Sequence, residues 1–160
     1  MWDNILGHAK QKEFLQRYLQ AQERPHALLF VGAEGLGKKQ LALAFAKALL
    51  CANHTGSDHC EACRLMNLED GNLSHPDFLL VQREQDEKTG RYKDISKDQI
   101  AELISKSAFA PVMSDTKVCI IEDVDRMSLV AANSFLKLLE EPPVGWVMVA
   151  SVKETLEHYG

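Results

Sequence analysis

Apolar and polar residues alternate in blocks along this chain of 160 residues, and four of the apolar blocks have the length of a buried strand. These four blocks are Ala27–Val31, Phe78–Val81, Lys117–Ile121 and Trp146–Ser151. Glycine, proline or charged residues flank each block, as is typical of the turns that end strands. The sequence therefore predicts four strands separated by longer connecting segments.

Two of these connecting segments have clear helical signals. Apolar residues recur at helical spacing after the first strand, which predicts a helix ending near Cys51. Ser96 and Gln99 are spaced as a capping box, so a second helix is expected to begin there and to end before Pro111. Strands that alternate with helices favour a parallel sheet covered on both faces, which is a three-layer αβα sandwich.

A third helix is expected to begin at Ser128 and to end before Pro142. Ser128 is a suitable N-cap, and the two consecutive prolines after the segment cannot continue a helix. Its buried stripe is expected to consist of Ala132, Phe135, Leu136 and Leu139.

The turn after the first strand carries a phosphate-binding pattern. It reads Gly32-Ala33-Glu34-Gly35-Leu36-Gly37-Lys38-Lys39. In such a loop the glycines let backbone N–H groups converge on an anion, and the lysine after the last glycine reaches the β- and γ-phosphates. Gly32, Gly35, Gly37, Lys38 and Lys39 are therefore candidate nucleotide-binding residues. The alternative is a glycine-rich connector that binds no ligand.

Lys39 departs from this pattern, because a complete P-loop has serine or threonine at its position. That hydroxyl normally holds Mg²⁺, whereas an ammonium group offers no oxygen ligand and repels a cation. The loop can still bind an anion, but it is poorly equipped to hydrolyse a nucleotide. ATP or ADP is thus a possible but weak ligand, and Mg²⁺ is a doubtful one.

Glu122 and Asp123 follow the third strand directly. Paired carboxylates at a strand end form the second half of a P-loop site, where one holds Mg²⁺ and the other activates water. The hydrolytic order is normally Asp then Glu, and this chain has the reverse. We therefore expect a degenerate catalytic pair, at the carboxyl end of a strand adjacent to the P-loop strand. The alternative is an acidic turn with no catalytic role.

Three cysteines follow the expected P-loop helix: Cys51, Cys60 and Cys63. Thiolates at such spacing are typical ligands of structural Zn²⁺, which takes four tetrahedral ligands. His54, Asp58 and His59 are possible fourth donors, none at a compelling spacing. A reduced, metal-free loop is the alternative. A fourth cysteine, Cys119, lies within a strand and is expected to be a small core residue.

The net charge of −5 argues against a domain that coats nucleic acid by itself, because such domains usually have a basic surface. This charge does not exclude that the protein belongs to a larger assembly that holds nucleic acid. No signal-peptide-like segment follows Met1, and no apolar run has the length of a membrane span. A globular, cytoplasmic protein without membrane contact is expected.

Six motifs occur in an order that resembles one known family. They are Ile5–His8, the P-loop, the cysteine cluster, His75–Asp77, Ile120–Asp123 and Ala131–Pro143. This order resembles the bacterial clamp-loader branch of the AAA+ proteins over almost the whole chain, and Asn133–Pro143 is its most specific part. Within that branch, the chain is most similar to the delta-prime subunits of DNA polymerase III. The tau and gamma motor subunits usually keep the hydroxyl residue and the Asp-Glu order that this chain lacks.

The resemblance implies a P-loop NTPase (AAA+) domain over residues 1–160, with a zinc-module-like insert at residues 51–63. It places Ile5 in the adenine pocket and Ser151 at the sensor position. Cys51, Cys60 and Cys63 match three of four zinc cysteines, and Ser57 stands where the family has the fourth. His54 is our choice for the fourth ligand. A helical lid and a collar domain, which the family has, are expected to be absent from this chain.

The implied partners are tau or gamma and delta subunits, with the sliding clamp and primer-template DNA reached through the assembly. The family also has a Ser-Arg-Cys motif that completes a neighbour's ATP site, and the chain stops at Gly160 without it. Two functions follow: a mainly structural clamp-loader subunit, or an active ATPase motor of the same assembly. Lys39 and the order of Glu122 and Asp123 favour the structural subunit, with little or no ATPase activity within a DNA-directed DNA polymerase holoenzyme. An unrelated P-loop ATPase with a zinc insert is a third hypothesis.

Overall fold

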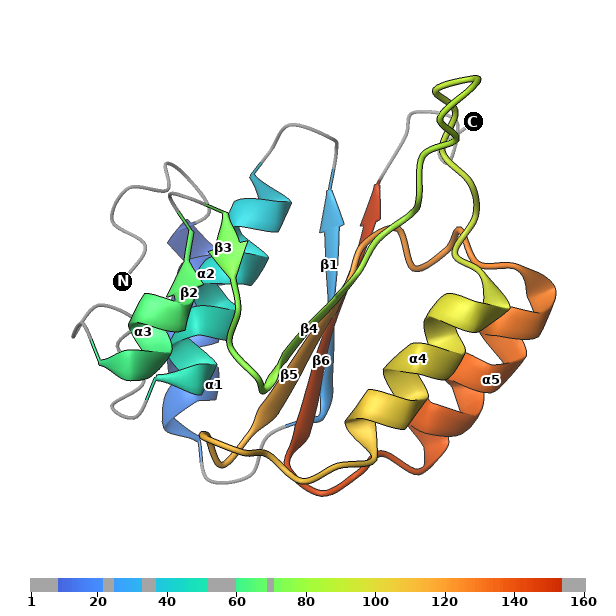
Figure 1. The fold of residues 1–160 in the computed structure, drawn as a ribbon. Coiled ribbons are helices and arrows are strands. Elements are labelled where there is room, and N and C mark those ends of the chain that lie inside the picture. The colour runs from blue at the N-terminus through green and yellow to red at the C-terminus, as the bar shows by residue number, and fades with distance from the viewer. Residues whose placement is uncertain (1–8, 22–24, 33–36, 52–59, 69–70, 154–160) are drawn as a thin grey trace.

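A parallel four-stranded sheet forms the centre of the protein in a computed structural model, which describes residues 9–21, 25–32, 37–51, 60–68 and 71–153. Its strands are β1 (Ala27–Gly32), β6 (Trp146–Lys153), β5 (Lys117–Ile121) and β4 (Phe78–Val81), in that spatial order. All neighbouring strands in this sheet are parallel. Their carboxyl ends therefore meet at one edge of the sheet (Figure 1).

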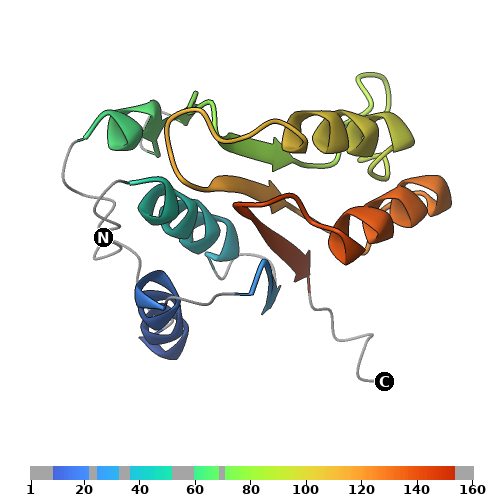
Figure 2. The same ribbon diagram turned by 90° about the horizontal axis from the view of Figure 1, so that it is seen from below.

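Helices cover both faces of this sheet. On one face lie α1 (Ala9–Gln20) and α2 (Lys38–Leu50), and on the other lie α4 (Lys97–Ser107) and α5 (Leu129–Glu140) (Figures 1 and 2). The expected three-layer αβα architecture is confirmed. Helix α1 was not predicted from the sequence. None of the helices in the described part of the chain has the length and apolar character that a bilayer-crossing helix needs.

The core consists of two apolar clusters, one under each helical layer. Phe45 of α2 is completely buried and makes an edge-to-face contact with Tyr18 of α1, with 5.3 Å between the ring centroids. On the opposite face, Ile100 of α4 and Phe135 of α5 pack against the sheet. Every residue of β5 is buried, as expected for a strand covered on both faces.

The capping box that begins α4 forms as predicted. The Ser96 hydroxyl accepts the backbone N–H of Gln99 at 3.2 Å, and the Gln99 side chain accepts the backbone N–H of Ser96 at 3.0 Å. These two bonds satisfy donors that the first helical turn leaves without an intrahelical partner. They direct the chain back from the long segment after β4 onto the sheet.

The predicted buried stripe of α5 is partly wrong. The buried residues are Ala131, Phe135 and Leu138, whereas Leu136 is 54 % exposed. Ala132 and Leu139, also in the predicted stripe, are only half-buried. Apolar residues occupy two neighbouring sides of this helix, so the periodicity alone fits either side. Contact with α4 and the sheet selects the side that contains Ala131.

The predicted adjacency of the P-loop strand and the Glu122 strand is also wrong. Strand β6 lies between β1 and β5 and pairs with both. The two motifs still reach the same edge of the sheet, because all three strands are parallel. Ser151 of β6 therefore lies between the ends of the two motif-bearing strands, opposite Phe30 in the register.

A small module joins α2 to the second half of the sheet. It contains α3 (Glu61–Leu65) and a two-stranded antiparallel sheet of β2 (Met66–Asn67) and β3 (Asn72–Leu73). The chain then passes His75 and Asp77, which are both buried, and enters β4. The cysteine-containing insert thus adjoins the main sheet.

Asp77 anchors a loop near this module. Its buried carboxylate accepts backbone N–H groups of Val112, Met113 and Ser114 at 2.6, 2.8 and 2.8 Å. Burial raises the pKa of the carboxyl group, but these three hydrogen bonds outweigh burial and hold the pKa below its ordinary value. The anchored loop leads into β5 and therefore helps to place that strand.

Candidate nucleotide and metal sites

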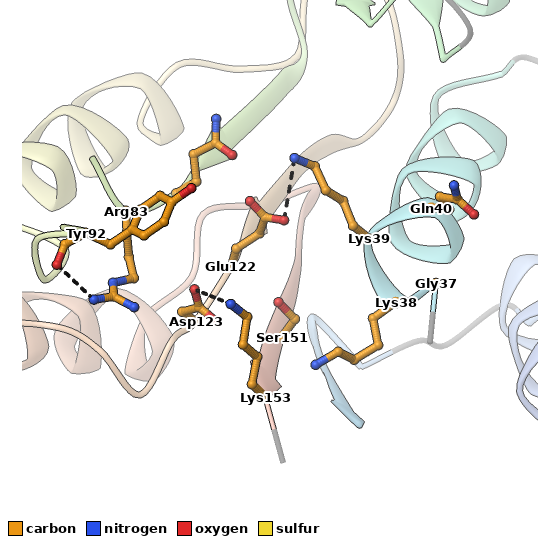
Figure 3. A pocket seen from close by; sticks show the side chains of 11 residues that line it. Gly37, Lys38, Lys39, Gln40, Arg83, Tyr92, Glu122, Asp123, Ser151 and Lys153 are labelled. Atoms are coloured by element: carbon orange, nitrogen blue, oxygen red, sulfur yellow. Dashed lines mark hydrogen bonds and ion pairs between the residues drawn. The ribbon is translucent and has the colours of Figure 1, made fainter. Parts of the chain in front are cut away.

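A polar pocket of about 580 Å³ lies at the carboxyl-end edge of the sheet (Figure 3). It is lined by Gly37, Lys38, Lys39, Gln40, Gln82, Arg83, Tyr92, Glu122, Asp123, Ser151 and Lys153. Six of the residues predicted from the sequence lie in it: Gly37, Lys38, Lys39, Glu122, Asp123 and Ser151. The fold thus brings the two halves of the expected P-loop site together around one cavity.

The beginning of α2 forms one wall of this pocket. Gly37 is the N-cap of the helix and has a left-handed backbone with φ of 80°, a conformation that glycine adopts without steric cost. The ammonium group of Lys38 donates to the backbone oxygen of Gly32 and, at 2.8 Å, to that of Val152. The P-loop lysine therefore links the ends of β1 and β6.

Lys39 forms an ion pair across the pocket. Its Nζ lies 3.7 Å from Oε1 of Glu122, whose side chain is 20 % exposed. Figure 3 shows the lysine reaching the carboxylate from α2. A cation therefore already lies beside the carboxylate that would bind Mg²⁺ in a complete P-loop site.

Asp123 has a corresponding lysine. Nζ of Lys153, at the end of β6, lies 3.9 Å from Oδ2 of Asp123, as Figure 3 shows. Asp123 has a φ of 54°, a left-handed conformation that aspartate adopts more readily than most residues. The backbone turns sharply there, and Val124 donates its N–H to the Ser151 oxygen at 3.0 Å. Both carboxylates of the degenerate pair are thus paired with lysines.

The segment after β4 supplies a wall that the sequence analysis did not assign. Arg83 donates to the backbone oxygens of Lys93 and Tyr92, each at 3.0 Å, and its guanidinium carbon lies 5.7 Å from the centre of the Tyr92 ring. Arg83 lies two residues after the end of β4, and Lys153 is the last residue of β6. Because ligands gather at the carboxyl ends of such strands, their positions were a signal that could have identified both residues.

The charges of the pocket favour an anion over a divalent cation. Four basic side chains, from Lys38, Lys39, Arg83 and Lys153, face two carboxylates, so the lining has a net charge of +2. A Mg²⁺ ion in a nucleotide site uses one or two carboxylates together with phosphate oxygens. Here lysines compete with such an ion for both carboxylates.

The second candidate site contains three cysteine sulfurs. Sγ of Cys60 lies 3.8 Å from Sγ of Cys51 and 3.6 Å from Sγ of Cys63, and all three sulfurs lie within 4.8 Å of one another. Cys51 is the C-cap of α2, Cys60 is the N-cap of α3, and Cys63 lies within α3. The fold therefore brings together cysteines from two helices.

This geometry fits three ligands of a tetrahedral zinc ion. Two sulfurs that each lie about 2.3 Å from such an ion are separated by about 3.8 Å, close to the spacing of these cysteines. Thiolate is also the ligand that structural zinc sites prefer. Among the described residues, no other cysteine, histidine or acidic side chain joins the cluster.

Three residues predicted to contribute to these sites lie outside the described part of the chain. They are Ile5 and Gly35 of the nucleotide site and His54 of the metal site. Ser57, which replaces the fourth cysteine of the resembled family, also lies outside it. Their roles stay predictions.

The sequence matches a known family model over nearly its whole length. Residues 7–156 match the family described as DNA polymerase III, delta subunit. The chain belongs to this family. The resemblance inferred from the motif order is therefore confirmed, and the matched range includes both the polar pocket and the cysteine cluster.

Within this family, the chain is similar to delta-prime proteins. It is 37 % identical over 131 residues to DNA polymerase III subunit delta' of Bacillus subtilis, an alignment that covers 81 % of this chain and 37 % of that protein. It is 29 % identical over 154 residues to the tau subunit of the same organism, covering 96 % of this chain and 26 % of tau. The chain thus spans 37 % of the length of the delta-prime protein and 26 % of the length of tau.

The fold also matches a solved structure. A gamma-subunit-related protein of DNA polymerase III from Thermotoga maritima superposes with a TM-score of 0.58 at 23 % sequence identity, covering 94 % of this chain and 41 % of that one. This match supports the three-layer αβα fold described above.

Proposed function

We propose that this protein is a delta-prime-type subunit of the clamp loader of a bacterial DNA polymerase III, and that its role is mainly structural. The single observation that carries the structural role is the Lys39–Glu122 ion pair at 3.7 Å. It puts an ammonium group beside the carboxylate that would hold Mg²⁺ in a P-loop ATPase. The domain keeps the shape of a nucleotide-binding module while lacking the groups that hydrolysis needs.

The alternative is an active ATPase motor of the tau or gamma type. The 29 % identity to tau over 96 % of this chain supports it. Two features of the pocket count against it: Lys39 supplies no oxygen ligand, and Lys153 pairs with Asp123 at 3.9 Å. The higher identity to a delta-prime protein, 37 %, also favours the structural subunit.

Under this proposal, Cys51, Cys60 and Cys63 hold a structural Zn²⁺ together with a fourth ligand, for which His54 is our choice. The spacing of the three sulfurs, 3.6 and 3.8 Å for the pairs with Cys60, supports it. Zinc has no redox chemistry and needs no open coordination position in a structural site. Its role here would be to connect the end of α2 to α3.

The proposed partners are tau or gamma and delta subunits, with the sliding clamp and primer-template DNA engaged by the whole assembly. A cytoplasmic location follows from this role. Family membership over residues 7–156 supports these partners. The protein would seat a neighbouring motor subunit, a role that uses the shape of the αβα domain and not hydrolysis.

Co-purification and clamp-loading assays test the proposal. The full-length protein is expected to co-purify with tau or gamma and delta subunits and to restore clamp loading when added to them. Purified alone, it is expected to show no ATP turnover above the background of a Lys38→Ala control. A protein that neither joins the assembly nor supports loading would refute the clamp-loader role, and turnover that Lys38→Ala abolishes would establish the motor alternative.

A further inference from the structure

We infer that the polar pocket binds a polyphosphate anion without Mg²⁺, and that Lys39 and Lys153 take the place of the metal. The inference deepens the proposed function and rests on the degenerate nucleotide site described there. Two ion pairs carry it, Lys39 with Glu122 at 3.7 Å and Lys153 with Asp123 at 3.9 Å.

The two lysines disfavour Mg²⁺ binding at Glu122 and Asp123. A Mg²⁺ ion demands oxygen ligands in near-ideal octahedral geometry and gives up its water reluctantly. To bind Glu122 or Asp123 here, it would have to displace an ammonium group and then remain beside that positive charge. Since both carboxylates have such a partner, neither offers the metal an uncontested ligand.

The same two lysines are accessible to an anion that enters the pocket from solvent. The side chains of Lys39 and Lys153 are 52 % and 45 % exposed, so a ligand that enters from solvent can reach both. An ammonium group carries three N–H donors, so it can stay near its carboxylate and also donate to a phosphate oxygen. With Lys38 and Arg83, these lysines give the lining a net charge of +2. This charge compensates part of the charge that Mg²⁺ would otherwise neutralise on a polyphosphate.

The wall formed by Arg83 and Tyr92 adds a positive charge and an aromatic side chain to the pocket. Two hydrogen bonds to the backbone fix the Arg83 side chain, so its positive charge stays at the pocket. Tyr92 is 60 % exposed and offers an aromatic side chain to the pocket. Inorganic polyphosphate and a nucleotide share the phosphate chemistry, and only the nucleotide has a base that can contact this ring.

Isothermal titration of the full-length protein with sodium tripolyphosphate and with ATP, each in EDTA and in excess Mg²⁺, tests the inference. Both ligands are expected to bind in EDTA. Excess Mg²⁺ is expected to weaken binding about tenfold, because it competes with the lysines for the phosphates. Tighter binding of ATP that Tyr92→Ala reduces to the tripolyphosphate value would identify the ligand as a nucleotide. Equal affinities would identify the phosphate chain alone.

Lys39→Met and Lys153→Met are each expected to reduce the affinity in EDTA about tenfold, because each removes a charged donor. Lys137→Met, which changes an exposed lysine of α5 outside the pocket, is the matched control and is expected to bind as the parent does. Circular dichroism verifies that all three variants are folded.

Absence of binding in EDTA, stronger binding in Mg²⁺, or unchanged affinity in both lysine variants would each overturn the inference. Co-purification with the other clamp-loader subunits is measured separately. Assembly without anion binding would refute only this inference, whereas anion binding without assembly would refute only the clamp-loader role.

Discussion

Nζ of Lys39 lies 3.7 Å from Oε1 of Glu122, so the residue that replaces the P-loop hydroxyl is paired with the carboxylate that would share its metal. Lys39 and Glu122, the two departures from a hydrolytic site, are therefore paired in space, although 82 residues lie between them in the chain. Restoring one of them alone leaves the other in place.

The combined variant Lys39→Thr, Glu122→Asp and Asp123→Glu is expected to gain Mg²⁺-dependent nucleotide binding. Threonine supplies an oxygen ligand and removes the competing ammonium group, and the two exchanges restore the order of the acids. Titration with ATP in Mg²⁺ and in EDTA measures the gain. Lys39→Arg, which keeps the positive charge, is the control and should gain nothing. Equal Mg²⁺ dependence in the parent and the triple variant would contradict the prediction.

If zinc connects α2 to α3 as proposed, its removal is expected to destabilise the cysteine module. Protein purified without chelator should contain about one zinc per chain, and Cys60→Ser should lower this content, because Cys60 lies near both other sulfurs. Mass spectrometry measures the zinc content of the parent protein and of Cys60→Ser.

Cys119→Ser serves as the control for metal content. Cys119 is buried in β5, where burial raises the pKa of its thiol, and it lies outside the cluster of Cys51, Cys60 and Cys63. This variant should keep its zinc. Equal metal content in Cys60→Ser and the parent would refute the metal site.

Asp77→Asn is expected to lower the free energy of unfolding by about 2–4 kcal/mol at neutral pH, because a neutral amide replaces a carboxylate that accepts three backbone N–H groups. The pKa of Asp77 is held below its ordinary value of 3.8. Its stabilisation is therefore present above pH 3.8 and is lost as the pH falls through the folded-state pKa. Urea unfolding at several pH values should show a difference between variant and parent that is constant near neutrality and shrinks in acid. A difference that grows in acid would contradict this assignment.

Phe135→Ala and Leu136→Ala form a matched pair on α5. Phe135 is 5 % exposed and packs in the core, so its truncation is expected to cost about 3–5 kcal/mol. Leu136 is 54 % exposed, so its truncation is expected to cost less than about 1 kcal/mol. Chemical denaturation measures both values. Similar costs for the two variants would show that α5 presents a different face to the core.

Local patterns in the sequence were sufficient to locate most of the regular elements. The bounds of β4 and β5, Phe78–Val81 and Lys117–Ile121, are the predicted ones. The capping box at Ser96 also forms as predicted. Each of these features depends on residues within a few positions of one another: an apolar run between turns, or a hydroxyl three residues from an amide side chain. Such short-range preferences are readable before any tertiary contact exists.

Long-range packing settled the remaining features. The insertion of β6 between β1 and β5, the buried side of α5, and the approach of Lys39 to Glu122 all join segments far apart in the chain. Arg83 and Lys153 belong to no local motif, and their positions near strand ends were the one sequence signal for them, but only the assembled sheet shows that those ends meet at the pocket. Strand order and helix rotation follow from which apolar surfaces cover one another in the complete core, and a single stretch of sequence does not contain that information.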